Sequence, residues 1–133
     1  MAAGIYSFTI EQGATTDFEV TYKDSTDTPV DLTGYKARMQ IRPSIRSSEI
    51  YLTLSSSLGP CGTGLNLSGS NGITPLASGS IGIFISAISS SQLDFDSAKY
   101  DLEIASGSGN CAVVTRLLQG NVKLSKEVTQ GSY

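Results

Sequence analysis

The sequence has no histidine and no tryptophan, and only two cysteines among its 133 residues. The lack of histidine removes the commonest general base, the Ser-His-Asp and Cys-His arrangements, and the commonest zinc ligand. Cys61 and Cys111 are too far apart in the chain to form a C-x-x-C pair. No glycine-rich loop precedes a helix, so a phosphate-binding loop is not expected. We therefore predict a protein that is not an enzyme and that uses no cofactor, no metal and no small-molecule substrate.

Charged residues are also scarce, and no basic run is present. Nine basic and twelve acidic residues give a net charge of −3. A nucleic-acid-binding protein would show a Lys/Arg stripe, because contacts to phosphate supply much of its affinity. No apolar run approaches the roughly 20 residues of a membrane span, and residues 1–10 have no basic segment of the kind that opens a secretion signal. We expect neither nucleic acid nor a membrane as a partner, and we expect the chain to fold where it is made.

Each cysteine stands in a segment rich in Gly, Ser or Asn, "GPCGTG" around Cys61 and "GSGNCAV" around Cys111. One disulfide between two loops, a reactive thiol and two free thiols are the alternatives. Two cysteines are too few for a disulfide scaffold, and a cytoplasmic environment keeps thiols reduced. These considerations favour two free thiols.

Alternation of apolar and polar residues dominates the sequence and predicts short strands. The apolar positions of the successive predicted strands are Tyr6, Phe8 and Ile10; Phe18, Val20 and Tyr22; Ala37, Met39 and Ile41; Ile50, Leu52 and Leu54; Leu65 and Leu67; Ile81, Ile83 and Ile85; Tyr100, Leu102 and Ile104; and Val114, Leu118, Val122 and Leu124. Pro43 should end the third strand, because proline cannot donate to a ladder. Gly120 is expected at a bulge or bend, and the segment 89–98 has room for one helical turn only.

Seven to nine short strands separated by turn signals are typical of an antiparallel sandwich. The length suits one core. We therefore predict an all-β, immunoglobulin-like antiparallel β-sandwich that forms a single domain over residues 1–133. A jelly roll or a small barrel is the alternative. The tail "TQGSY" is expected to be frayed or to make contacts.

One segment, "DFDSAKYDLEI" at residues 94–104, resembles the tyrosine corner of immunoglobulin-type domains. In that motif a tyrosine near a strand start bonds through its hydroxyl to the backbone a few residues upstream. Tyr100 takes the place of that tyrosine, and Asp96 can close the turn through its side chain. Leu102 stands where antibodies keep a cysteine, so apolar packing should replace the disulfide. We predict that Tyr100 is buried and that its hydroxyl is satisfied.

Two groups of carboxylates are close in sequence: Asp24, Asp27 and Asp31, and Asp94, Asp96 and Asp101. A calcium site would need several such oxygens to converge. Turn capping and solvent-facing strand positions explain the same residues without a metal, and we favour that explanation.

The order of several segments resembles a virion module of tailed phages. These segments are "YSFTIEQGATTDFEVTYKD", "TPVDLTGYKARMQIRP", "YDLEIASG" and "VTRLLQGNVKLSKEVT". Together they are similar to the N-terminal immunoglobulin-like domain of phage baseplate upper proteins, and closer still to small structural proteins of tailed phages that infect cyanobacteria. The resemblance covers nearly the whole chain. In the baseplate proteins this module anchors a larger receptor-binding chain, but the sequence ends just after the module, so we do not expect receptor binding from it.

The resemblance implies a structural component of the virion, made in the host cytoplasm, that contacts other virion proteins in a symmetric ring or lattice. A tail or baseplate protein that joins other components is the first expectation, and a capsid decoration protein is the alternative. Arg38, Arg42, Arg46 and Arg116 are candidate interface charges, although they could simply solvate a sheet face. A carbohydrate-binding module is an unrelated alternative, for which Tyr35, Tyr51 and Tyr133 would be the exposed aromatics.

Overall fold

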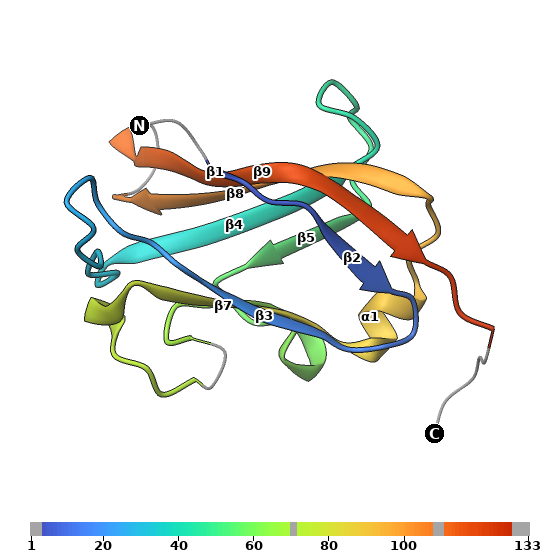
Figure 1. Cartoon of the computed structure of the whole chain (residues 1–133), viewed down its shortest axis with the longest axis horizontal. Coiled ribbons are helices and arrows are strands. Elements are labelled where there is room, and N and C mark those ends of the chain that lie inside the picture. The colour runs from blue at the N-terminus through green and yellow to red at the C-terminus, as the bar shows by residue number, and fades with distance from the viewer. Residues whose placement is uncertain (1–3, 70–71, 108–110, 129–133) are drawn as a thin grey trace.

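A computed structural model describes residues 4–69, 72–107 and 111–128. These residues form two β-sheets packed face to face, which confirms the predicted all-β sandwich (Figure 1). The strands are β1 Gly4–Ile5, β2 Phe8–Glu11, β3 Thr16–Thr21, β4 Tyr35–Arg42, β5 Leu52–Ser55, β6 Gly64–Asn66, β7 Ser80–Ile85, β8 Ser97–Ser106 and β9 Val113–Ser125. The helical elements are one α-helix, α1 at Ala87–Ser91, and two 3-10 turns, η1 at Pro60–Gly62 and η2 at Leu76–Ser78.

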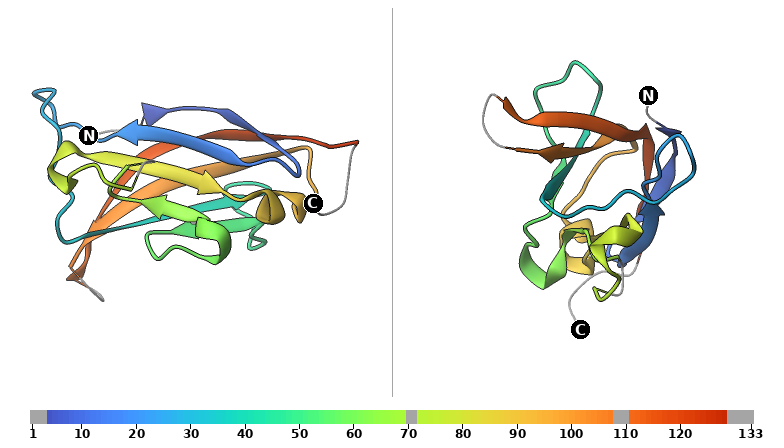
Figure 2. Two further views of the ribbon diagram at one scale, coloured as in Figure 1. Left: turned by 90° about the horizontal axis from the view of Figure 1, so that it is seen from below. Right: turned by 90° about the vertical axis from the view of Figure 1, so that its left-hand side faces the viewer.

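The strand order is that of an immunoglobulin-like sandwich. The large sheet runs β1-β9-β8-β4-β5, with β2 also paired to β9, and the small sheet runs β3-β7-β6. The series β9-β8-β4-β5 corresponds to strands G-F-C-C′, and β3-β7-β6 corresponds to B-E-D. The two layers and the turn of α1 at one end are visible in Figure 2. One feature departs from the purely antiparallel prediction, because β1 and β2 both pair with β9 in parallel.

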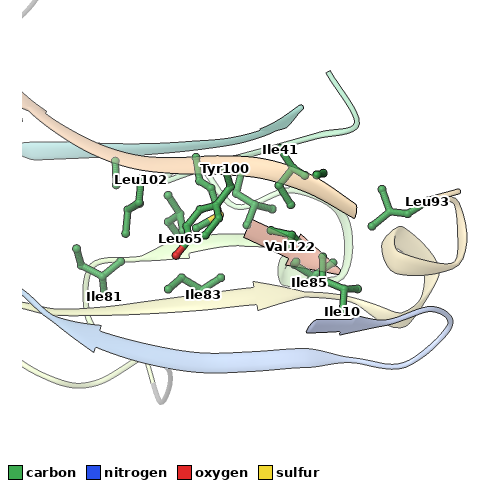
Figure 3. Packing of buried hydrophobic residues seen from close by; sticks show 14 of the residues in the cluster. Ile10, Ile41, Leu65, Ile81, Ile83, Ile85, Leu93, Tyr100, Leu102 and Val122 are labelled. Atoms are coloured by element: carbon green, nitrogen blue, oxygen red, sulfur yellow. The ribbon is translucent and has the colours of Figure 1, made fainter. Parts of the chain in front are cut away.

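The core lies between the sheets and is built from the alternating positions of the sequence. The burial patterns of β4 and β8 alternate, so every second side chain of these strands points inward, whereas β7 is buried along nearly its whole length. The fully buried side chains include Met39, Ile83 and Leu102. In Figure 3, Leu102 and Ile41 from the large sheet face Ile81 and Ile83 from the small sheet. Burial of these large apolar side chains is the main term that stabilises the fold.

Several local predictions were wrong or incomplete, among them the inward position of Val114, which is 53% exposed. Ile50 lies before β5 and is 43% exposed, so it is not part of the fourth strand's inner face. The first predicted strand is split into β1 and β2 by Tyr6 and Ser7, which we call the first-strand junction. The bulge in β9 falls at Leu117, because Leu102 pairs with Leu118 whereas Glu103 pairs with Arg116.

Gly120 has a different role from the predicted bulge. It pairs with Tyr100 across β8 and β9. The carbonyl oxygen of Tyr6 lies so close to Gly120 that a Cβ atom at position 120 would overlap it. On the same side, the Tyr6 amide donates to the Gln119 carbonyl at 3.0 Å, and the Asn121 amide donates to the Ser7 hydroxyl at 3.2 Å. The missing side chain of Gly120 therefore makes room for the first-strand junction.

Substitution Gly120→Ala should lower the free energy of unfolding by about 1–3 kcal/mol, because the added methyl group must displace a backbone carbonyl. Urea unfolding followed by circular dichroism measures the effect. Gly59→Ala is the matched control, since a Cβ there would lie 3.4 Å from its nearest neighbour, the Thr63 carbonyl oxygen. Equal stability changes in the two variants would show that the close approach at Gly120 is unimportant.

Candidate functional site

Tyr100 is buried as predicted, but its hydroxyl has a different partner from the one expected. The side chain is 5% exposed, and the hydroxyl donates to the carbonyl oxygen of Tyr6 at 2.5 Å. A tyrosine-corner bond would go to the segment just before β8. Here the acceptor is 94 residues away in the sequence, in the first-strand junction. The predicted corner bond is therefore wrong, and Tyr100 ties β8 to the first strand instead.

Of the two other residues of the predicted corner, Leu102 is buried and Asp96 is exposed. Leu102 is fully buried in the core cluster, in agreement with apolar packing at the cysteine position. The Asp96 side chain is 96% exposed, and its contact is with the Lys126 ammonium at 3.5 Å rather than with the turn. It is the backbone of Asp96 that ties the chain, because its carbonyl accepts from the Leu124 amide at 3.1 Å.

Aromatic rings fill the side of the sandwich where β2 of one sheet faces β3 of the other. Phe8 lies at the centre, with ring centroids 5.0 Å from Phe18 and 5.1 Å from Tyr100. The Tyr6 ring continues the group at 5.8 Å from Phe18. These tilted and edge-on pairs contribute beyond their buried area. Because β3 has no strand beside it on this side in the sheet order, the rings close the space between the two sheets.

Burial of the Tyr100 phenol raises its pKa to about 12, with a smaller contribution from the neighbouring phenol of Tyr6. Burial acts this way because it disfavours the charged phenolate. The Tyr100 side chain is therefore a neutral hydrogen-bond donor over the whole physiological range of pH.

The exposed side of β4, β8 and β9, which we call the outer face, holds three of the four predicted interface arginines. Arg38, Arg42 and Arg116 line a hollow of about 470 Å³ on this face. Arg46 is exposed in the loop after β4 and is not among the residues that line the hollow. The structure thus brings three of the four arginines, from β4 and β9, to one surface. Their role at an interface stays a prediction.

Ion pairs fix the arginines on the outer face. The Arg38 guanidinium lies 2.9 Å from a Glu103 carboxylate oxygen, and the Arg116 guanidinium lies 3.5 Å from Asp101. Arg42 donates to the Gln40 side chain at 2.7 and 3.2 Å. Partial burial and the nearby Glu103 raise the pKa of Asp101, and the arginines only partly oppose this. Such exposed pairs add little to stability, but they hold the guanidinium groups in place.

Two exposed isoleucines also line the hollow, and the sequence pattern did not single them out. Ile5 is 81% exposed and Ile45 is 86% exposed. Ile5 comes from β1 and Ile45 from the loop after β4, so they reach the hollow from different parts of the chain. The sequence signal that could have identified them is that both are apolar and that neither belongs to the alternating positions of the predicted strands. Exposed apolar side chains around a polar surface are a common feature of protein-binding sites.

The other candidate residues have local structural partners. Asp24 accepts from the Thr26 hydroxyl and amide and from the Thr28 amide, and Asp31 accepts from Thr33, so both act in turns. These hydrogen bonds, led by those from the threonine side chains, lower the pKa of both carboxyls. Within the described residues no group of three or more Cys, Asp or Glu side chains could hold a metal ion. Cys61 and Cys111 are both free and exposed, as favoured above.

The tyrosines proposed for a carbohydrate site are differently placed. Tyr35 and Tyr51 are partly buried against the core, and the Tyr51 ring stacks on Phe95 at 4.7 Å. Tyr133, like the tail "TQGSY", lies outside the described residues.

A comparison with protein-family models finds no match, and a comparison with curated proteins finds none either. Among the described residues, no helix is long and apolar enough to cross a membrane.

Substitution Tyr100→Phe should lower the free energy of unfolding by about 1 kcal/mol, because the Tyr6 carbonyl loses its donor while the ring packing stays. Tyr22→Phe is the control, since Tyr22 is also partly buried against the core and its hydroxyl has no hydrogen bond to the described residues. Both variants can be compared by urea unfolding. A loss in Tyr22→Phe as large as in Tyr100→Phe would argue against a special role for the Tyr100 bond.

The raised pKa of Tyr100 makes a further prediction about stability at high pH. Its pKa is about 12 in the folded chain against an ordinary value of 10.0. Above pH 10 the unfolded chain releases this proton while the folded chain keeps it, so the free energy of unfolding must fall as the pH rises toward about 12. Below pH 10 this contribution is complete and constant. Urea unfolding at intervals from pH 9 to 12 should show a steeper fall for the natural sequence than for Tyr100→Phe, and parallel curves would contradict the assignment.

Proposed function

We propose that this chain is a non-enzymatic structural component of a tailed-phage virion, which joins other components of the tail or baseplate. Two lines of argument support the proposal. The first is the resemblance of the ordered segments to phage virion modules, described above. The second is the outer face, whose shape and chemistry suit a protein partner.

The hollow on the outer face is the observation on which the proposal mainly rests. Its lining includes charged groups that are already paired, Arg38 with Glu103 and Arg116 with Asp101. Paired charges at fixed positions give orientation and specificity to a protein contact rather than chemistry on a substrate. Ile5 and Ile45 provide exposed apolar area beside them. This combination of an apolar contribution and oriented polar groups matches the composition of protein interfaces.

A capsid decoration protein on the head surface is the second candidate, because the same face could bind a capsid lattice. The carbohydrate-binding alternative is weaker, since Tyr35 and Tyr51 are packed against the core and so offer little open ring surface for stacking on a sugar.

Quantitative mass spectrometry of purified virions, with antibody labelling viewed by electron microscopy, tests the proposal. A tail or baseplate protein that forms a closed symmetric ring should be present in few copies, about six or twelve, and the label should lie at the tail. Hundreds of copies on the head would reject the tail assignment in favour of decoration. Absence of the chain from purified virions would reject both.

A further inference from the structure

The charges of this chain are separated between the two faces of the sandwich. Six of the nine basic residues have outward-facing positions on β4, β8 and β9: Lys36, Arg38, Arg42, Lys99, Arg116 and Lys123. Only two acidic residues, Asp101 and Glu103, share that face. Alternation explains the arrangement, because the inner positions of these strands are apolar and the basic residues occupy the other side of each strand. In a chain with a net charge of −3, the outer face therefore has an excess of positive charge.

The small sheet shows the opposite sign. Its strands β3, β6 and β7 contain no basic residue, and Asp17 and Glu19 are exposed on the outward side of β3. Gly69 lies beside Glu19 and Thr74, since a side chain at position 69 would meet both the Glu19 carboxylate and the Thr74 side chain. Next to Thr74 is Ile73, which is 83% exposed. We call this surface, formed by Asp17, Glu19 and Ile73, the acidic face.

The two faces complement each other. The outer face offers guanidinium groups together with the apolar side chains of Ile5 and Ile45, and the acidic face offers two carboxylates with the apolar side chain of Ile73. They belong to opposite sheets of the sandwich, so one copy cannot use both on the same partner surface. Contacts between two different surfaces of identical copies are head-to-tail contacts, and they build rings or open filaments.

We infer that the partner of the outer face is a second copy of this chain, which docks with its acidic face. Copies then repeat head to tail, with the arginines of one copy facing Asp17 and Glu19 of the next. This inference deepens the proposed function, on which its biological setting rests, but the contact itself can be tested with the isolated chain.

Sedimentation velocity of the purified full chain, over a concentration series in about 20 mM and about 500 mM salt, gives the first test. The chain should self-associate as concentration rises in low salt, and association should weaken in high salt because exposed charges are screened. The variant Arg38→Gln/Arg116→Gln should associate about tenfold more weakly, since two exposed ion pairs are lost. The variant Lys23→Gln/Lys126→Gln is the matched control with the same net charge, and it should associate like the natural sequence.

A mixing experiment tests the head-to-tail geometry. Arg38→Gln/Arg116→Gln weakens the outer face but keeps the acidic face, and Asp17→Lys/Glu19→Lys does the reverse. At a protein concentration where the natural sequence associates in low salt and the arginine variant does not, each variant alone should be monomeric. An equimolar mixture should form a one-to-one dimer, because one natural contact is still available between the two. Circular dichroism and thermal unfolding of each variant confirm that it is folded before mixing.

Several results would overturn the inference. The natural chain could remain monomeric at all concentrations in low salt, or the Lys23/Lys126 control could lose association as fully as the arginine variant. Self-association of Asp17→Lys/Glu19→Lys alone would indicate contact between two outer faces instead of head-to-tail docking. These outcomes concern the contact only. A monomeric chain found in purified virions would reject the inference and keep the proposed function, whereas an associating chain absent from virions would do the opposite.

Discussion

The hydrogen bond from the Tyr100 hydroxyl to the Tyr6 carbonyl links β8 directly to the first-strand junction, which is otherwise hydrogen-bonded to β9. It connects the first-strand junction to β8, at a point where β9 has only a glycine, Gly120, between them. The same junction places the aromatic rings that close the space between β2 and β3. A buried phenol needs a partner and a backbone carbonyl needs a donor, so one bond meets two requirements. This bond adds to the parallel pairing of β1 and β2 with β9.

This bond also has a consequence for the outer face. Ile5 ends β1 directly before the junction, and it lines the hollow together with Tyr100 and Gly120. The buried and exposed sides of β8 are therefore linked. The buried Tyr100 side chain holds the first-strand junction, and Ile5, which directly precedes that junction, reaches the outer face. The position of one apolar contributor to the proposed docking surface thus depends on the core.

Much of the sandwich could be predicted from the sequence, because apolar residues occupy every second, inward-facing position along β3, β4, β7 and β8. Although β8 begins at Ser97, three residues earlier than expected, the burial of Tyr100 was also predictable. Its partner was not, since the acceptor is a backbone carbonyl that leaves no mark in the sequence and is distant along the chain. The same reason explains the misplaced bulge: Gly120 suggests local backbone freedom, whereas its role is to accommodate Tyr6. That Arg38 and Arg116 lie on one surface depends on the pairing register of the strands, which the sequence pattern does not reveal. That Ile5 and Ile45 reach the same surface depends on the tertiary fold.

The central claim is that the first strand belongs to the same cooperative unit as β8 because the Tyr100 bond holds it there. Amide hydrogen exchange in low concentrations of denaturant tests this claim most directly. The amides of Tyr6 and Ile10 should exchange only through the opening that also exposes the amide of Leu102, with the same dependence on denaturant. Exchange of Tyr6 and Ile10 through a separate local opening that denaturant does not affect, while Leu102 stays protected, would contradict the account.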